Sequence, residues 1–151
     1  MLNMKNRIVL IIVGVSGLLL GMFSQAAQGW SEDFDKVMQQ AKEEGKYVLA
    51  DFTGSDWCGW CIRLNKEVFS QKEFKDYAKD NLLLVSLDFP SNKEQSEALK
   101  KQNATLAKKY GIRGYPTVLI FNPQGEVIEK TGYRKGGAKA YVEYLKSLIT
   151  K

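Results

Sequence analysis

The sequence Trp57-Cys58-Gly59-Trp60-Cys61 contains both cysteines of this 151-residue chain. It follows an apolar run at residues 47–52 and a short polar turn, where a buried strand would give way to a helix. Residues three apart lie on one face of a helix, so the two sulfur atoms can come within bonding distance. The free N–H groups and the positive dipole end of the first helical turn favour a thiolate there. The stretch therefore predicts a redox-active cysteine pair and a thiol–disulfide oxidoreductase.

The composition limits the chain to one domain and argues against nucleic-acid binding. With 151 residues, 44% of them hydrophobic, the chain can bury one core but is too short for two. Its formal net charge is +5, a mild excess that is usually a solvated surface. No basic stripe with interleaved aromatic residues is present, so we expect no nucleic-acid partner.

The chain contains no histidine, and this absence excludes several kinds of site. Cys–His proteases, Ser–His–Asp hydrolases and zinc sites with histidine ligands all need that side chain. Residue 62 is isoleucine, so the haem-attachment pattern C-x-x-C-H is excluded as well. A zinc site made of cysteines alone would need a second pair. We therefore expect no metal and no cofactor.

Residues 1–27 have the three-part pattern of an export signal. Lys5 and Arg7 form its positive region, and residues 8–23 form an apolar core. Ser24-Gln25-Ala26 then fits the small-x-small cleavage rule. The 16-residue core is shorter than the roughly 20 residues that span a bilayer, which leaves an uncleaved anchor as the alternative. We therefore expect an exported, periplasmic protein whose mature domain occupies residues 28–151, in a compartment where disulfide chemistry occurs.

Hydrophobic periodicity and turn residues predict alternating helices and strands. The first half should form a helix capped by Ser31 and ended by Gly45, a strand at 47–52, the cysteine-bearing helix to about residue 69, and a helix opened by the capping box Ser70-Gln71-Lys72-Glu73. A strand at 82–87 and a polar helix at 94–110 should follow. The chain should end with strands at 117–121 and 127–131 around the turn Asn122-Pro123-Gln124-Gly125, and an amphipathic helix at 141–149. Strands that alternate with helices imply a parallel core, and the closing hairpin adds an antiparallel edge. The predicted fold class is α/β.

Two separated segments resemble thioredoxins. Tyr110-Gly111-Ile112-Arg113-Gly114-Tyr115-Pro116-Thr117-Val118-Leu119-Ile120-Phe121 is similar to the segment that holds the thioredoxin cis-proline opposite the active site. Ala50-Asp51-Phe52 resembles the strand that carries the buried aspartate of thioredoxins. The resemblance covers residues 31–151 and implies a thioredoxin fold, with a central mixed sheet of about four to five strands flanked by helices. More narrowly, residues 51–58, Asp88-Phe89-Pro90 and Gly136-Gly137-Ala138 resemble DsbH-type periplasmic thioredoxin-like oxidoreductases.

The resemblance implies a role for each cysteine. Cys58 would be the exposed nucleophile that attacks a substrate disulfide and forms a mixed disulfide. Cys61, one turn deeper, would resolve that intermediate and leave both active-site sulfurs bonded. The alternative is a structural disulfide or two buried thiols. A loop of three residues constrains the unfolded chain very little, which makes a purely structural disulfide the weaker interpretation.

Asp51 is the third candidate catalytic residue. Burial in an otherwise apolar strand would raise its pKa, so that it could take the proton of Cys61 during resolution. The alternative is an aspartate at a strand end that caps the following turn. Ser86 stands where thioredoxins commonly place a lysine near that aspartate, and the spacing from Asp51 to Cys58 is one residue longer than in the usual thioredoxin pattern.

The substrate groove is predicted beside the cysteines. The resemblance implies a cis Tyr115–Pro116 peptide next to Cys58, with backbone groups that pair with an extended substrate chain. A trans proline before a strand is the alternative. The other residues expected to line the groove are Trp57, Gly59, Trp60 and Gly132. For Trp60, at the exposed start of a helix, we favour substrate contact over a role as core filler.

The dipeptide between the cysteines bears on the direction of electron flow. Strongly oxidising relatives have a histidine there that stabilises the thiolate, whereas this chain has Gly59-Trp60. The pair should therefore hold its disulfide firmly and act as a reductant of protein disulfides. A reductase needs electrons from outside, and we expect a membrane thiol–disulfide relay of the DsbD kind to supply them. The alternatives are an oxidase or isomerase, and a non-catalytic thioredoxin-fold binding module; we expect a monomer.

Residues 91–109 form a polar stretch that is longer than the matching part of a minimal thioredoxin. Two interpretations remain open for it. It is either a solvated helix, which we favour, or a surface that binds a partner.

Overall fold

The computed structural model of the chain describes residues 29–149. Its helices and strands are, in chain order, α1 (Phe34–Glu44), β1 (Tyr47–Thr53), α2 (Gly59–Leu64), the π-helical turn η1 (Asn65–Phe69), α3 (Lys72–Asn81), β2 (Leu82–Asp88), α4 (Glu97–Lys109), β3 (Thr117–Phe121), β4 (Val127–Thr131) and α5 (Gly137–Ile149). This order is the predicted one. The export signal predicted at residues 1–27 lies outside the described residues.

The four strands form one mixed sheet in the order β2-β1-β3-β4. β1 runs parallel to β2 and antiparallel to β3, and β4 closes the sheet as an antiparallel hairpin partner of β3. The β3–β4 turn is the predicted one, because the Gly125 N–H donates to the Asn122 carbonyl oxygen at 2.9 Å. Gly125 has a φ of 86°, a conformation that glycine adopts without strain. The predicted antiparallel hairpin edge is confirmed. The predicted parallel core is confirmed only for β1 and β2, because β3 pairs antiparallel with β1 at the centre of the sheet.

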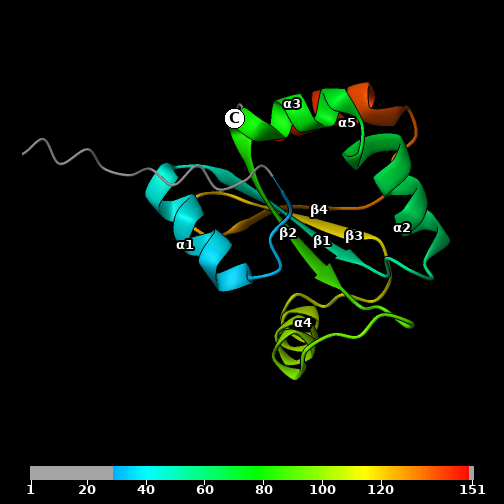
Figure 1. Cartoon of the computed structure of the whole chain (residues 1–151). Coiled ribbons are helices and arrows are strands. Elements are labelled where there is room, and N and C mark those ends of the chain that lie inside the picture. The colour runs from blue at the N-terminus through cyan, green and yellow to red at the C-terminus, as the bar shows by residue number, and fades with distance from the viewer. Residues whose placement is uncertain (1–28, 150–151) are drawn as a thin grey trace, which may run out of the picture.

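Two layers of helices cover the sheet, because alternate side chains of each strand point to opposite faces. One face carries Leu49 and Ile120 and packs against α2, η1, α3 and α5. The other face carries Val48 and Phe121 and packs against α1 and α4. Figure 1 shows α3 and α5 side by side over the first face and α4 on the opposite side of the sheet. Asp51, two residues after Leu49, belongs to the face that α2 covers.

The start of α1 differs from the prediction. Asp33 is the N-cap, and its carboxylate accepts a hydrogen bond from the Lys36 N–H at 3.0 Å. Ser31 instead extends the sheet, through a parallel bridge to Val85 at the edge of β2. Because Ser31 is paired with β2, it lies two residues before the N-cap of α1 and does not cap that helix. The end of α1 is confirmed, with Gly45 in the left-handed conformation at φ 66°.

The predicted capping box at Ser70-Gln71-Lys72-Glu73 is also wrong. The N-cap of α3 is Gln71, and its side chain makes no capping hydrogen bond. Ser70 belongs to the preceding turn, because its N–H donates to the Asn65 carbonyl oxygen at 2.8 Å and its hydroxyl lies 3.3 Å from Asn65 Oδ1. The π-helical turn η1 continues α2 up to this serine and so removes it from α3.

The polar helix α4 is shorter than predicted at its start. It begins at Glu97, after an N-cap at Ser96 whose hydroxyl accepts from the Leu99 N–H at 3.2 Å. The residues predicted to form an earlier turn, 94–96, remain in the connection from β2. In this helix Leu106 is buried, whereas Leu99 is half-buried, as is Tyr110 at the helix end.

Candidate active site

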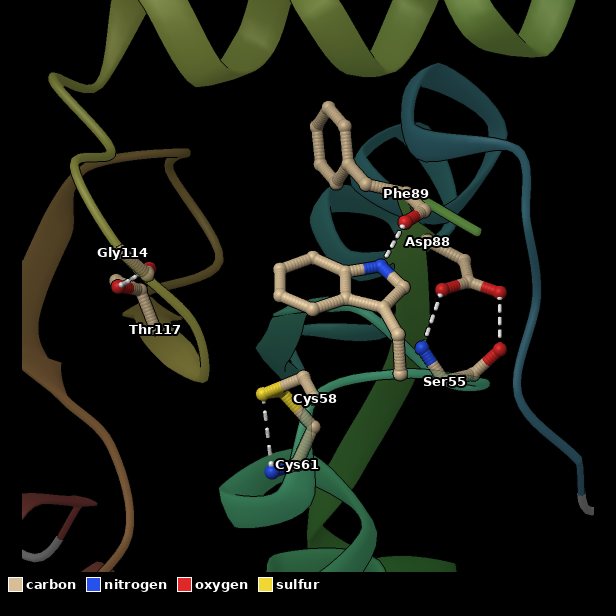
Figure 2. Close-up of a disulfide and its surroundings, with 8 residues drawn as sticks. Ser55, Cys58, Cys61, Asp88, Phe89, Gly114 and Thr117 are labelled. Atoms are coloured by element: carbon tan, nitrogen blue, oxygen red, sulfur yellow. Dashed lines mark hydrogen bonds between the residues drawn. A yellow bond between two sulfur atoms is a disulfide. The ribbon is translucent and has the colours of Figure 1, made fainter. Parts of the chain in front are cut away.

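The two cysteines form a disulfide at the start of α2. Their Cα atoms are 5.2 Å apart, and Cys58 is the N-cap of the helix. The Cys61 N–H donates to the Cys58 sulfur at 3.2 Å, as Figure 2 shows. Cys58 is 7% exposed and Cys61 is 4% exposed, so the predicted nucleophile is less accessible than the sequence suggested. In the disulfide the Cys58 sulfur turns back over the first helical turn, which reduces its exposure.

The turn before the cysteines holds Trp57 in place over Gly54. The Cys58 N–H donates to the Gly54 carbonyl oxygen at 2.8 Å, which brings Cys58 to the start of the helix. A Cβ atom on Gly54 would lie 2.5 Å from the indole of Trp57, so only glycine fits there. The indole N–H donates to the carbonyl oxygen of Phe89 at 2.7 Å (Figure 2), although the tryptophan is 49% exposed. Trp57 is therefore an exposed but firmly oriented side chain next to the disulfide.

The loop before β3 lies beside the cysteine turn at one end of the sheet. β1 leads into the cysteine turn, and β3 starts after Pro116. Since these strands are antiparallel neighbours, the C-terminal end of β1 and the N-terminal end of β3 lie at the same end of the sheet. The Tyr115–Pro116 peptide bond is cis. The ring of Tyr115 lies edge-on to the ring of Trp57, with centroids 5.9 Å apart. The structure thus places Trp57 and Tyr115, two of the residues that the sequence assigned to the substrate groove, in contact with each other.

Gly132 supports the proline loop from the end of β4. A Cβ atom on this glycine would lie 2.9 Å from the carbonyl oxygen of Pro116, so a side chain would displace the loop. The carbonyl oxygen of Gly132 in turn accepts a hydrogen bond from the Tyr141 hydroxyl of α5 at 3.2 Å. Gly59, the other glycine predicted at the site, begins α2 and has open space around its Cα.

Asp51 is buried beneath the disulfide. It is 8% exposed, and its Oδ1 atom has no hydrogen-bond partner within the described residues. Burial, together with the nearby negative charge of Asp88, raises the pKa of Asp51 to about 7. Asp51 and Cys61 both line a pocket of about 300 Å³. The alternative role, a strand-end aspartate that caps the following turn, does not fit a carboxylate oxygen without a partner.

Trp60 is exposed and belongs to a cluster that the sequence did not predict. It is 54% exposed, and its ring centroid lies 5.1 Å from that of Tyr133. The Arg63 guanidinium lies against both rings, 5.4 Å from Trp60 and 5.2 Å from Tyr133. Glu67 holds this cluster together, because it accepts from the Tyr133 hydroxyl at 2.6 Å and from Arg63 Nε at 2.7 Å. Trp60 is thus not core filler.

Residues 29–149 contain neither a membrane-crossing helix nor a cluster of metal ligands. No helix in this range is long and apolar enough to cross a membrane. No group of three or more cysteine and acidic side chains in the same range is placed to hold a metal ion.

The sequence matches the thioredoxin-like domain family over residues 34–147. The chain belongs to the thioredoxin-like family. The disulfide at a helix start, the mixed sheet and the proline loop opposite the cysteines are the arrangement that the sequence resemblance implied.

The chain is similar to several thiol–disulfide proteins. It is 32% identical to the disulfide bond reductase DsbH of Chlamydia pneumoniae over 118 residues, which are 78% of this chain and 71% of that protein. It is 32% identical to the thiol:disulfide interchange protein DsbD of Yersinia pestis, over 72% of this chain but only 16% of that protein. A solved structure of a DsbH oxidoreductase superimposes with a TM-score of 0.76 at 31% identity, covering 81% of this chain and 84% of that one. These relationships confirm the predicted thioredoxin fold and the class of protein thiol–disulfide oxidoreductases.

Proposed function

We propose that the protein is an exported reductase of protein disulfides that acts through Cys58 and Cys61. The observation that carries this proposal is the disulfide at the start of α2, whose Cys61 lines the same pocket as the buried Asp51. The relative named disulfide bond reductase DsbH supports the direction. The lack of a histidine between the cysteines supports it further, because less stabilisation of the thiolate means a more stable disulfide and a lower potential.

The chemistry begins with the reduced cysteine pair. The Cys58 thiolate attacks one sulfur of a substrate disulfide, and the other substrate sulfur leaves with the electron pair and takes up a proton. The resulting mixed disulfide joins Cys58 to the substrate. Cys61 then loses its proton and attacks the Cys58 sulfur, which releases the second substrate thiolate. The enzyme is left with the Cys58–Cys61 disulfide present in the structure, and the substrate has gained two electrons and two protons.

Asp51 is proposed as the group that takes the proton of Cys61. The two residues line the same pocket, and a base with a pKa of about 7 is matched to proton transfer at neutral pH. A carboxylate oxygen without a hydrogen-bond partner also has a free lone pair for that proton.

The groove around the disulfide is proposed to bind an extended segment of the substrate protein. Backbone groups at Tyr115 and Pro116 would pair with the substrate chain, as in the addition of a strand. The exposed rings of Trp57 and Trp60 would contact the residues that flank the substrate cysteine. Gly59 would leave room for the substrate backbone beside the sulfur, and Gly132 would let the Pro116 loop keep its position.

The electron donor and the compartment are part of the same proposal. Each turnover consumes two electrons, so a dithiol partner must reduce the Cys58–Cys61 disulfide again. The similarity to DsbD proteins supports a membrane relay of that kind as the donor. Residues 1–27 would direct export to the periplasm, and residues 28–151 would then work there as a monomer.

The test is reduction of a defined protein disulfide by the purified protein. Insulin, with dithiothreitol as the electron source, provides a turnover assay in which the reduced B chain precipitates. We expect turnover with the wild-type protein and none with Cys58→Ser. An oxidase or isomerase would instead oxidise reduced ribonuclease or rescue scrambled ribonuclease faster than it reduces insulin. A binding module would suppress aggregation of an unfolded client equally well after Cys58→Ser.

A further inference from the structure

Asp88, the last residue of β2, is bonded to the turn that precedes the cysteines. Its Oδ1 accepts from the Ser55 N–H at 2.9 Å, and its Oδ2 accepts from the Ser55 hydroxyl at 2.6 Å. Figure 2 shows both bonds, with the carboxylate facing Ser55 across the chain and the disulfide following in the same turn. Both oxygens of one carboxylate are therefore used to hold one residue, three positions before Cys58.

The backbone of Asp88 is itself held in place from the polar stretch 91–109. Its carbonyl oxygen accepts from Gln95 Nε2 at 3.1 Å and from Asn103 Nδ2 at 2.9 Å. Asn103 belongs to α4 and is 2% exposed, which is unusual for an amide side chain on a polar helix. A buried amide is retained where its hydrogen bonds are satisfied, and this one is satisfied by Asp88.

Further hydrogen bonds join the turn before Cys58 to the polar stretch 91–109. The Asp56 carboxylate accepts from the backbone N–H groups of Ser91 and Asn92 at 2.9 and 2.7 Å. Lys93 Nζ lies 3.0 Å from the Ser55 hydroxyl oxygen. The polar stretch, for which the sequence left two interpretations open, thus holds the cysteine turn in place through hydrogen bonds.

The charge of Asp88 also acts on Asp51. β1 and β2 are parallel and pair Asp51 with Ser86 and Thr53 with Asp88, so both aspartates lie on the same face of the sheet. The other titratable groups facing Asp51 are Cys61 from α2 and Tyr141 from α5. Asp88 is the negative charge that adds to burial in raising the pKa of Asp51.

We propose that Asp88 is a positioning residue of the redox centre, which fixes the turn before Cys58 through Ser55 and places a negative charge beside Asp51. The inference rests on the proposed function, since it is Asp51 that takes the Cys61 proton. In that step the proton moves from Cys61 to Asp51, and the Cys61 sulfur bonds to the Cys58 sulfur. The bond from Cys58 to the substrate breaks, and its electron pair leaves with the substrate sulfur. A neighbouring negative charge makes Asp51 a stronger base for this transfer.

The test separates the charge of Asp88 from its hydrogen bonds. Asp88→Asn removes the charge in a side chain of the same shape, whereas Ser55→Ala removes the hydroxyl bonded to Asp88 and Lys93 and keeps the charge of Asp88. The pKa of Asp51 is read by carbon-13 NMR titration of its carboxyl group in the oxidised full-length protein. We expect Asp88→Asn to lower this pKa by about half a unit to one unit, and Ser55→Ala to leave it within about 0.2 unit. Asp56→Asn is the matched control, because it removes another carboxylate of the same turn and should leave the pKa of Asp51 unchanged.

Hydrogen exchange at the Cys58 amide measures how firmly the turn is held. This N–H is bonded to Gly54 within the turn, so loosening the turn exposes it. We expect exchange to be at least about threefold faster in Ser55→Ala and in Asp88→Ser than in the wild type. Asp88→Ser is also the second neutral variant for the titration, should Asp88→Asn not fold.

Each outcome supports or overturns the inference. An unchanged pKa of Asp51 in both neutral variants overturns the electrostatic role of Asp88. Unchanged exchange at Cys58 in Ser55→Ala and Asp88→Ser overturns the structural role. Both measurements are made without substrate, so they hold whichever way electrons flow. A wild-type protein that does not reduce insulin contradicts the proposed function and leaves these two results standing.

Discussion

Asp51 and Cys61 line the same pocket, which has a volume of about 300 Å³. The hydroxyl-bearing residues Thr53, Ser55 and Ser86 line it as well. A pocket of this size and polarity can hold several water molecules, each bridging groups that would otherwise be unsatisfied. Water in the pocket would connect Asp51 Oδ1, which has no partner among the described residues, to the sulfur of Cys61. We expect the proton of Cys61 to reach Asp51 through this water.

The raised pKa of Asp51 predicts a stability that depends on pH. The ordinary pKa of the group is 3.8 and its folded value is about 7. Between these values the folded protein holds a proton that the unfolded chain has released, so the free energy of unfolding falls as the pH rises. Above pH 7 this loss of unfolding free energy is complete, and Asp51→Asn removes the carboxyl group that causes it. The stability gained by this variant should be larger at pH 8 than at pH 4 by roughly 4 kcal/mol, from about 1.4 kcal/mol per pKa unit.

Urea unfolding of the oxidised protein at the two pH values measures this difference. Comparing the variant with the wild type at each pH cancels the packing cost of the asparagine, which is the same at both. A gain that does not change between pH 4 and pH 8 would show that Asp51 ionises normally in the folded protein. The proposed proton acceptor would then be wrong.

Replacing Cys58 and Cys61 by serine should stop the reaction at two different steps. Cys58→Ser removes the nucleophile, so no mixed disulfide forms and turnover is lost. Cys61→Ser removes the resolving sulfur, so the protein should remain joined to its substrate through Cys58. Non-reducing electrophoresis after mixing with an oxidised substrate protein would show this complex, and dithiothreitol would dissolve it. Equal trapping by both variants would contradict the assigned roles.

Trp60 should contribute to substrate binding and not to folding. Its ring is 54% exposed and is fixed by Arg63 and Tyr133, so little conformational entropy is lost when a substrate packs on it. We expect Trp60→Ala to lower kcat/KM for a protein substrate about five- to tenfold, mainly through KM. Ile128→Ala is the matched control, because Ile128 is an exposed hydrophobic residue on β4. An equal effect of both variants would mean that Trp60 has no specific contact with the substrate.

Gly132 should tolerate no side chain. A Cβ atom there would lie 2.9 Å from the Pro116 carbonyl oxygen, a backbone atom that cannot rotate away. We expect Gly132→Ala to destabilise the protein by about 1–3 kcal/mol and to lower kcat/KM by at least about tenfold. Gly114→Ala is the control, since a Cβ atom on this glycine of the same loop meets nothing within 4 Å. Similar loss in both variants would argue against a specific contact with Pro116.

Local patterns in the sequence were sufficient to predict the order of helices and strands and the cysteine chemistry, whereas the thioredoxin fold was implied by the resemblance. The cysteine spacing, the apolar strands and the turn at residues 122–125 each depend on residues close together in the chain. The burial of Asp51 could be predicted for the same reason, because its neighbours in the strand are apolar. Helix starts were less predictable, since tertiary contacts recruit Ser31 into the sheet and Ser70 into the end of η1.

The supports of the site could not be predicted, because they join distant residues of ordinary type. Ser55 and Asp88 are 33 residues apart, and Glu67 and Tyr133 are 66 apart. A serine or an aspartate near a turn has no pattern that identifies its partner before the fold is known. The single sequence signal was Asp88-Phe89-Pro90, which the narrower resemblance singled out without a role.

The reduction potential of the Cys58–Cys61 pair tests the central claim most directly. It is measured by equilibrating the purified protein with glutathione buffers and quantifying the disulfide form. A reductase fed by a dithiol donor should have a potential near or below about −250 mV, in the range of thioredoxin. A potential above about −180 mV would place the protein with isomerases and oxidants, and would contradict the proposed direction of electron flow.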